Sequence, residues 1–187
     1  MKLGGDAEAG MSAAVGIQGG IALGLSPVNT YEIECRGADG ALKWTETVTN
    51  LITTEGGNNL LTNYLKGSAY TAAFFVGLIN GATPTLVIGD VAAQIGGTNG
   101  WTEYVAYSET VRQTLTLGTA ASKSIDNTAS RAVFTINGGG GTIGGAFVVT
   151  VSTKSGTTGV IYGEAALGAA RTVIAGDSLT ITATLTI

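Results

Sequence analysis

The chain has 187 residues, of which 44% are hydrophobic and only 12% are charged, and its formal net charge is −4. This length fits one domain with an appendage better than two domains. The acidic balance argues against direct binding of nucleic acid, which usually needs a basic face. Ordinary chains carry about 25% charged residues, so the low value here indicates a surface that a partner covers.

The histidine and cysteine content of the chain excludes several kinds of functional site. The chain has no histidine and a single cysteine, Cys35. An internal disulfide, histidine-dependent catalysis and zinc sites are therefore excluded. Cys35 alternates with Tyr31 and Ile33 on one face of an expected strand. We interpret it as a small core residue rather than a nucleophile.

Residues 1–30 are rich in glycine and alanine, and we expect them to form an extended N-terminal arm. A signal peptide is disfavoured because Lys2 is the only early positive charge and Asp6 and Glu8 soon follow. The apolar residues from Met11 onward are too few and too interrupted by glycine to span a membrane. Little side-chain volume is present to offset the entropy lost on ordering. We therefore expect the arm to lie along a neighbouring subunit or along the surface of a partner.

Residues 31–36 and 41–49 are the first two expected strands. Between them lies Gly37-Ala38-Asp39-Gly40, and its Asp-Gly pair predicts a hairpin. Asp39 is interpreted as a turn residue and not as a calcium ligand, because no EF-hand spacing follows it.

The main helix is expected over residues 55–66. Thr54 is its predicted N-cap, and Lys66 followed by Gly67 suits its C-terminal end. One apolar face has helical spacing and consists of Leu60, Leu61, Tyr64 and Leu65. This face predicts that the helix covers an open end or face of the β-structure.

Further strands are expected from apolar runs separated by turn residues, and a short helix from residues 90–95. In the strand expected over residues 109–117, Val111 and Leu115 oppose Arg112 and Thr114. The glycine-rich stretch 138–145 precedes the strand expected at the centre of the sheet. The last strand alternates apolar residues with threonines. The expected strands span residues 73–79, 101–107, 109–117, 132–137, 146–151, 159–162 and 178–187.

This pattern predicts a mainly β fold. We expect residues 31–187 to form one antiparallel, jelly-roll-like β-sandwich with one main short helix, preceded by the arm of residues 1–30.

Candidate catalytic patterns are weak in this sequence. Gly138 to Gly145 lacks the Gly-Lys-Ser/Thr ending of a phosphate loop, and Lys154-Ser155-Gly156 is better interpreted as a turn. Glu164 and Asp177 are a conceivable carboxylate pair for glycoside hydrolysis, but sequence gives no separation between them. We predict that the chain is not an enzyme and has no catalytic, cofactor-binding or metal site.

Three aromatic residues raise the alternative of a sugar-stacking surface. They are Trp44, Trp101 and Tyr104. Core packing is the favoured interpretation for each of them.

Several stretches resemble a family of tailed-bacteriophage virion proteins that are encoded with the capsid genes. The resemblance covers about residues 31–187 and leaves the arm out. The stretches are Lys43-Trp44-Thr45-Glu46, Asn50-Leu51-Ile52-Thr53-Thr54-Glu55-Gly56, Phe75-Val76-Gly77-Leu78-Ile79, Gly100-Trp101-Thr102-Glu103 with Tyr107-Ser108 and Arg112, Phe134-Thr135-Ile136, Ile143-Gly144-Gly145-Ala146-Phe147, and Gly176-Asp177.

The resemblance implies a capsid decoration (cement) protein that binds the outer surface of the virion shell and clamps neighbouring capsomers. The expected partners are the major capsid protein and copies of the chain itself, as a trimer or a dimer, with neither nucleic acid nor membrane. Low charge and the absence of a recognised catalytic set suit a permanent assembly component. The alternative is a tail- or fibre-associated virion protein that binds a receptor or a glycan.

Overall fold

The fold is mainly β and antiparallel. The computed structural model describes residues 27–65, 73–97 and 101–187. Its strands in chain order are β1 (Val28–Arg36), β2 (Leu42–Ile52), β3 (Phe75–Asn80), β4 (Thr102–Tyr104), β5 (Gln113–Thr114), β6 (Ser124–Asp126), β7 (Ala132–Thr135), β8 (Gly141–Val149), β9 (Ile161–Val173) and β10 (Ser178–Thr186). Helix α1 (Thr54–Leu60) continues into a π-helical turn over Leu61–Leu65, and short 3₁₀ turns span Ala92–Ile95 and Thr128–Ser130.

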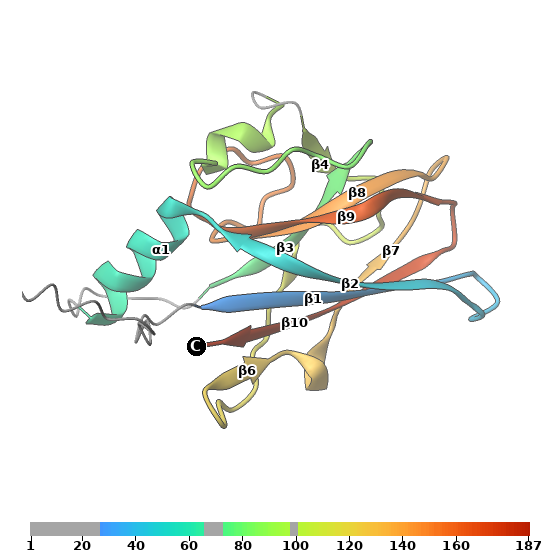
Figure 1. The fold of residues 1–187 in the computed structure, drawn as a ribbon. Coiled ribbons are helices and arrows are strands. Elements are labelled where there is room, and N and C mark those ends of the chain that lie inside the picture. Colours follow the sequence, from blue (N-terminus) through green and yellow to red (C-terminus); the bar gives the residue numbers. More distant parts are fainter. Residues whose placement is uncertain (1–26, 66–72, 98–100) are drawn as a thin grey trace, which may run out of the picture.

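The strands form one curled sheet in the order β4-β3-β8-β9-β2-β1-β10-β6, with β5 beside β3 and β7 beside β10. Strand β2 joins the two halves of the sheet. It pairs with β1 along nearly its whole length, but it meets β9 only through Leu51 and Ile52. The half that contains β1 and β10 therefore faces the half that contains β3, β8 and β9 (Figure 1).

The hairpin between β1 and β2 confirms the turn prediction. Gly40 has φ 80°, and the backbone N–H of Ala41 donates a 2.9 Å hydrogen bond to the Asp39 carboxylate. Strand β1 begins at Val28 rather than Tyr31, because Val28 already pairs with Thr186 of β10. The rest of the predicted arm, residues 1–26, lies outside the described residues.

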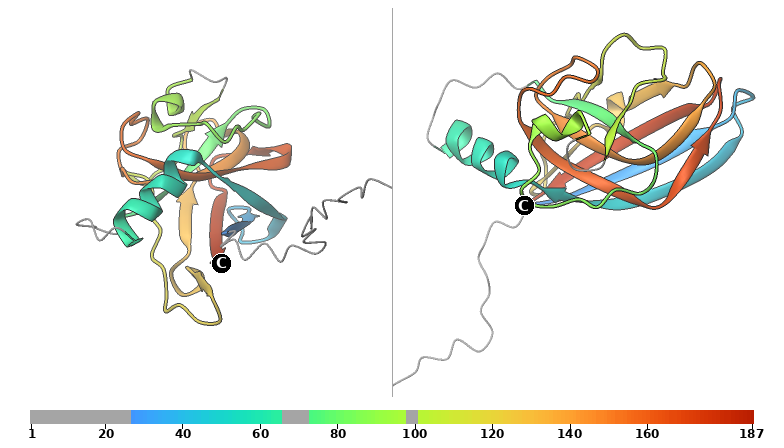
Figure 2. Two further views of the ribbon diagram at one scale, coloured as in Figure 1. Left: turned by 60° about the vertical axis from the view of Figure 1, so that its left-hand side comes forward. Right: turned by 90° about the horizontal axis from the view of Figure 1, so that it is seen from above.

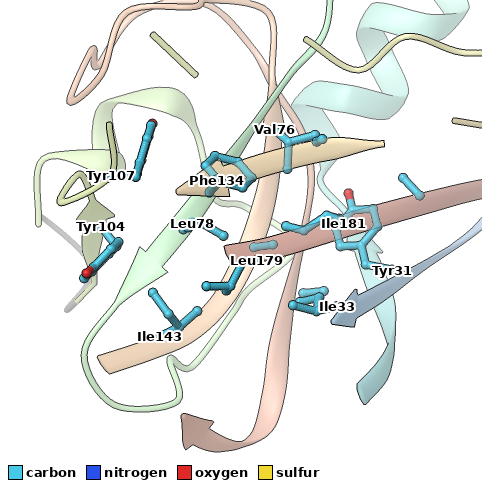
Figure 3. Packing of buried hydrophobic residues seen from close by; sticks show 14 of the residues in the cluster. Tyr31, Ile33, Val76, Leu78, Tyr104, Tyr107, Phe134, Ile143, Leu179 and Ile181 are labelled. Atoms are coloured by element: carbon cyan, nitrogen blue, oxygen red, sulfur yellow. The ribbon is translucent and has the colours of Figure 1, made fainter. Parts of the chain in front are cut away.

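The main core lies between the two halves of the sheet (Figure 3). Strand β1 supplies Tyr31 and Ile33, and β10 supplies Leu179 and Ile181; all four are almost completely buried. The predicted alternation of the last strand is confirmed over these positions. A second, smaller core forms on the other face of β3, β8 and β9, under the segment that carries the 3₁₀ turn Ala92–Ile95. It contains Ile79, Ala92, Ile95, Trp101, Phe147, Val149 and Ile161.

The central strand is longer than predicted. β8 begins at Gly141, because Gly144 and Gly145 belong to the strand and not to a turn. A Cβ atom on Gly144 would collide with the backbone of Ala82, and one on Gly145 would collide with that of Ala165. These glycines therefore allow neighbouring backbone to approach closely.

Strand β9 is much longer than the expected 159–162. It continues to Val173 through Gly163, Gly168 and several alanines, residue types with low β-propensity. Its length is set by pairing with β8 on one side, which the local sequence does not encode.

The predicted packing of the helix is wrong for Leu60 and Leu61, and the helix begins one residue earlier than the predicted N-cap Thr54 implies. Its N-cap is Thr53, whose hydroxyl accepts a 2.9 Å hydrogen bond from the N–H of Gly56. Leu60 and Leu61 are 39% and 55% exposed, and α1 projects from one end of the sheet (Figure 2). The helix contacts the sheet through Gly56, which lies against the backbone of Tyr162. The predicted C-terminal residue Lys66 lies outside the described residues.

The strands expected over residues 101–107 and 109–117 are mostly irregular in the structure, which has only the short β4 and β5 there. The expected facing is also wrong, since Val111 is 45% exposed while Arg112 is completely buried. An ion pair inside the protein explains this inversion.

Candidate interaction surface

Arg112 is held by groups from two other parts of the chain. Its Nε and Nη2 atoms donate to the two carboxylate oxygens of Glu103, each at 2.9 Å. It also donates to the carbonyls of Val151 at 2.8 Å and Gly156 at 2.9 Å. The guanidinium lies 5.3 Å from the centre of the Phe147 ring. This buried pair fixes the loop between β8 and β9 to the segment before β5.

The predicted turn at Lys154-Ser155-Gly156 is confirmed as part of that loop. Ser155 has φ 55°, and its backbone N–H donates to Glu103 at 2.5 Å. Lys154 lies over the Tyr107 ring, with its Nζ atom 3.6 Å from the ring centre, and donates to the Tyr107 carbonyl at 2.8 Å. These contacts describe an anchored loop and not a nucleophile beside a base.

The two carboxylates considered for glycoside hydrolysis have different surroundings. Asp177 accepts a 2.5 Å hydrogen bond from the Nζ of Lys43 and lies 3.9 Å from the sulfur of Cys35. Burial opposes its ionisation, but the hydrogen bonds from Lys43 and the N–H of Ile174 lower the pKa of Asp177 overall. Glu164, in contrast, is buried in β9 beside Asp90.

Glu164 and Asp90 form a second buried polar contact. Both side chains are completely shielded from solvent, and Asp90 comes from the segment that covers the smaller core. Burial and the neighbouring Asp90 carboxyl raise the pKa of Glu164 to about 9. Glu164 is therefore protonated at neutral pH and links this segment to the sheet.

Cys35 is completely buried, as its alternation predicts. Burial and the nearby charge of Asp177 raise the pKa of its thiol to about 11. It is a core residue in this fold.

The aromatic residues considered for sugar stacking have separate locations. Trp101 and Tyr104 are 2% and 4% exposed and belong to the two cores, which confirms the packing interpretation for them. Trp44 on β2 is only partly buried, and the Arg171 guanidinium lies 5.6 Å from its ring centre.

Trp44 and Arg171 lie on one side of the molecule, between residues 42–50 of β2 and residues 165–173 of β9. We call this the open side, because these two stretches are not paired with each other. In the described structure it is bridged by contacts of the Glu46 and Trp44 side chains and not by strand pairing. Glu46 of β2 accepts a 2.8 Å hydrogen bond from Arg171 and a 2.5 Å hydrogen bond from the N–H of Gly168.

A second exposed region is the end of the molecule where β2 ends, which we call the β2 end. Strand β1 begins there, the chain reaches Ile187 there, and the N–H of Thr54 in α1 donates to Ile88 at 2.7 Å. Large apolar side chains are exposed at this end. They are Val28 (48%), Leu60 (39%), Leu61 (55%), Ile88 (62%) and Ile187 (55%).

Within residues 27–65, 73–97 and 101–187, no group of three or more acidic or cysteine side chains is placed to hold a metal ion. In the same part of the chain, no helix has the length and hydrophobicity needed to cross a membrane.

Sequence reasoning missed the pair of Arg112 and Glu103 and the link between Asp90 and Glu164. The sequence does contain a signal for such pairs: only 12% of the residues are charged, and some of these charged residues lie next to apolar ones. A charge in apolar surroundings requires a partner. Comparison with known proteins adds nothing to these findings, since no family model, curated protein or solved structure matches the chain.

Proposed function

We propose that this chain is a structural protein of a tailed-bacteriophage virion, bound to the outer capsid surface, where it cements neighbouring capsomers. In this proposal the curled sheet is a jelly-roll-like sandwich, and residues 1–26 belong to an attachment arm. The partners are the major capsid protein and further copies of the chain.

The observation that carries the proposal is the exposed apolar character of the β2 end. Among the described residues five large apolar side chains are more than half exposed, and three of them, Ile88, Leu61 and Ile187, lie at this end, which supports an interaction site there. The same end is where residues 1–26 join β1, so an arm and an apolar surface would act on one partner.

The interior supports a structural role over a chemical one. The buried charges of Arg112 and Glu103 are satisfied by each other and by backbone groups, and they fix loops. A permanent assembly component needs a rigid body and an apolar contact surface more than it needs a reactive site.

The test is to mix the purified full-length chain with capsid shells that lack it and to measure occupancy by imaging at subunit resolution. The Ile88→Glu variant should lower occupancy strongly, because a carboxylate at a dry interface is costly. The matched control is Ile174→Glu, which changes a 57% exposed isoleucine in the turn between β9 and β10, away from the β2 end, and should leave occupancy unchanged.

Removing residues 1–27 should also weaken attachment while residues 28–187 remain folded. Equal occupancy for the wild type and Ile88→Glu would contradict a contact through the β2 end. Binding of the free protein to cells or sugars, with no binding to shells, would instead favour the tail- or fibre-associated alternative.

A further inference from the structure

Strand β2 has a long edge without a strand beside it in the described structure. Of its 11 residues, all but Leu51 and Ile52 lack a partner on the side opposite β1. This free edge is about 30 Å long at roughly 3.3 Å per residue. A free edge of this kind presents unpaired N–H and C=O groups and is a template for another strand.

The other edges of the described sheet are short or interrupted. β4, β5, β6 and β7 have only two to four residues each. β9 is interrupted by a large irregularity, because its residues 167–170 lie opposite the single residue Gly144, between the pairs Ile143↔Arg171 and Gly145↔Ala166. β2 contains no proline, and its register shift lies near its start, where Lys43 has no partner in β1, so residues 44–50 present a regular edge for strand addition.

The core behind this edge is incompletely covered. Trp44 and Val48 face the core, opposite Cys35 and Tyr31 of β1, yet both remain partly exposed. An added strand with apolar side chains on one face would cover them. Such a strand would pack beside the contact between Glu46 and Arg171.

The sequence before β1 has the alternation that this edge requires. From Val15 to Leu25, large apolar residues occur only at odd positions, and the even positions carry glycine, alanine or glutamine. A period of two is the pattern of a strand with one apolar face. The large residues are Val15, Ile17, Ile21, Leu23 and Leu25.

We propose that residues 15–25 of a second copy of this chain add to the free edge of β2 as an extra strand. Backbone hydrogen bonds would supply the pairing, and the odd-numbered side chains would cover Trp44 and Val48. The small even-numbered residues would face outward beside Thr45 and Thr47, which are exposed.

A second copy is a better donor than the same copy for a geometric reason. Leu25 precedes Val28 by three residues, which span about 10 Å when extended. A strand added to the free side of β2 would lie two strand spacings from β1, which is also about 10 Å. The three residues before Val28 are therefore too short to pass around the end of β2 and reach that side. At the end of β2 the place beside Leu51 and Ile52 is already occupied by Glu164 and Gly163 of β9, so the chain of the same copy cannot cross there. A strand that reaches Leu25 therefore fits only when it comes from another copy.

The inference concerns contacts between copies and needs no capsid, so it can fail or hold separately from the proposed function. The first experiment measures the mass of the purified full chain in solution by light scattering over a range of concentrations. The wild type should assemble. Ile21→Glu should raise the concentration needed for assembly by at least about tenfold, because it buries a carboxylate. The matched control Gln18→Glu places the same charge on the outward face and should assemble like the wild type.

The second experiment locates the contact. Chains carrying Gln18→Cys are mixed with chains carrying Thr45→Cys, Thr47→Cys or Thr49→Cys, and disulfides are formed under mild oxidation. At least one mixture should give a dimer that contains one chain of each kind. Ala129→Cys, an exposed position in the 3₁₀ turn Thr128–Ser130, is the control and should give none.

Three results would overturn the proposal. They are a wild type that stays monomeric at all concentrations, assembly that Ile21→Glu leaves unchanged, and mixtures in which the Gln18→Cys chain forms no disulfide with any of the three threonine variants.

Discussion

Arg112 donates two parallel hydrogen bonds to the carboxylate of Glu103, and the two side chains are 0% and 1% exposed. Such a bidentate pair is specific in geometry because the planar guanidinium matches the carboxylate. The two residues are only nine positions apart, yet they also fasten the loop between β8 and β9.

Removal of one partner of this pair should be strongly destabilising. Arg112→Met would leave the Glu103 carboxylate buried without its counter-charge, and we expect a loss of about 3–5 kcal/mol in the free energy of unfolding. Urea denaturation measures this loss. The control is Arg36→Met, which removes an exposed pair with Glu34 and should have little effect. A loss below about 1 kcal/mol for Arg112→Met would contradict the buried role.

The contact between Glu164 and Asp90 should make stability depend on pH. The folded protein holds a proton on Glu164 up to a pKa of about 9, whereas the unfolded chain releases it near the ordinary value of 4.5. Folding therefore binds a proton between these values, and the free energy of unfolding should fall as pH rises from 5 toward 9.

Thermal unfolding at several values between pH 5 and pH 8.5 measures this slope. Glu164→Gln removes the titration but keeps a hydrogen-bond donor, so its slope should be flatter than that of the wild type. If the stability of the wild type and of Glu164→Gln changed equally with pH, the proton bound on folding would not be held by Glu164.

The thiol of Cys35 should react only after the protein opens. It is 0% exposed, and its pKa of about 11 keeps it protonated at neutral pH. A thiol reagent at pH 7.5 should modify the native protein far more slowly than the urea-unfolded chain. An added cysteine at exposed Ala129 is the positive control and should react at once. Rapid labelling of Cys35 in the native protein would disprove its burial.

Two neighbouring glycines of α1 should respond in opposite directions to alanine. Gly56→Ala places a Cβ atom against the backbone of Tyr162, so it should destabilise the protein. Gly57→Ala meets no heavy atom within 4 Å and should stabilise it by about 0.5–1 kcal/mol through helix propensity. Urea denaturation of both variants separates the two effects. Equal effects would mean that α1 does not pack on β9 through its first turn.

The parts of this protein that the sequence predicts are those encoded locally. Asp39 and Gly40 specify the hairpin because turn geometry depends on adjacent residues, and the alternation from Leu179 to Ala183 specifies β10 because side chains in a strand alternate between faces. The buried state of Cys35 follows from the same rule in β1.

The remaining features depend on residues that are distant in the chain. The burial of Arg112 requires Glu103 and the carbonyls of another loop, and the packing of α1 depends on Gly56 meeting Tyr162 of β9. The free edge of β2 exists because β9 pairs with it at only two positions before the strands diverge. The strand pattern before β1 was readable from the sequence, but only the tertiary structure shows an edge that it can join. Pairing across the sheet is decided by the whole fold. Each strand supplies backbone donors and acceptors that many other strands could satisfy, so its local sequence does not specify its partner.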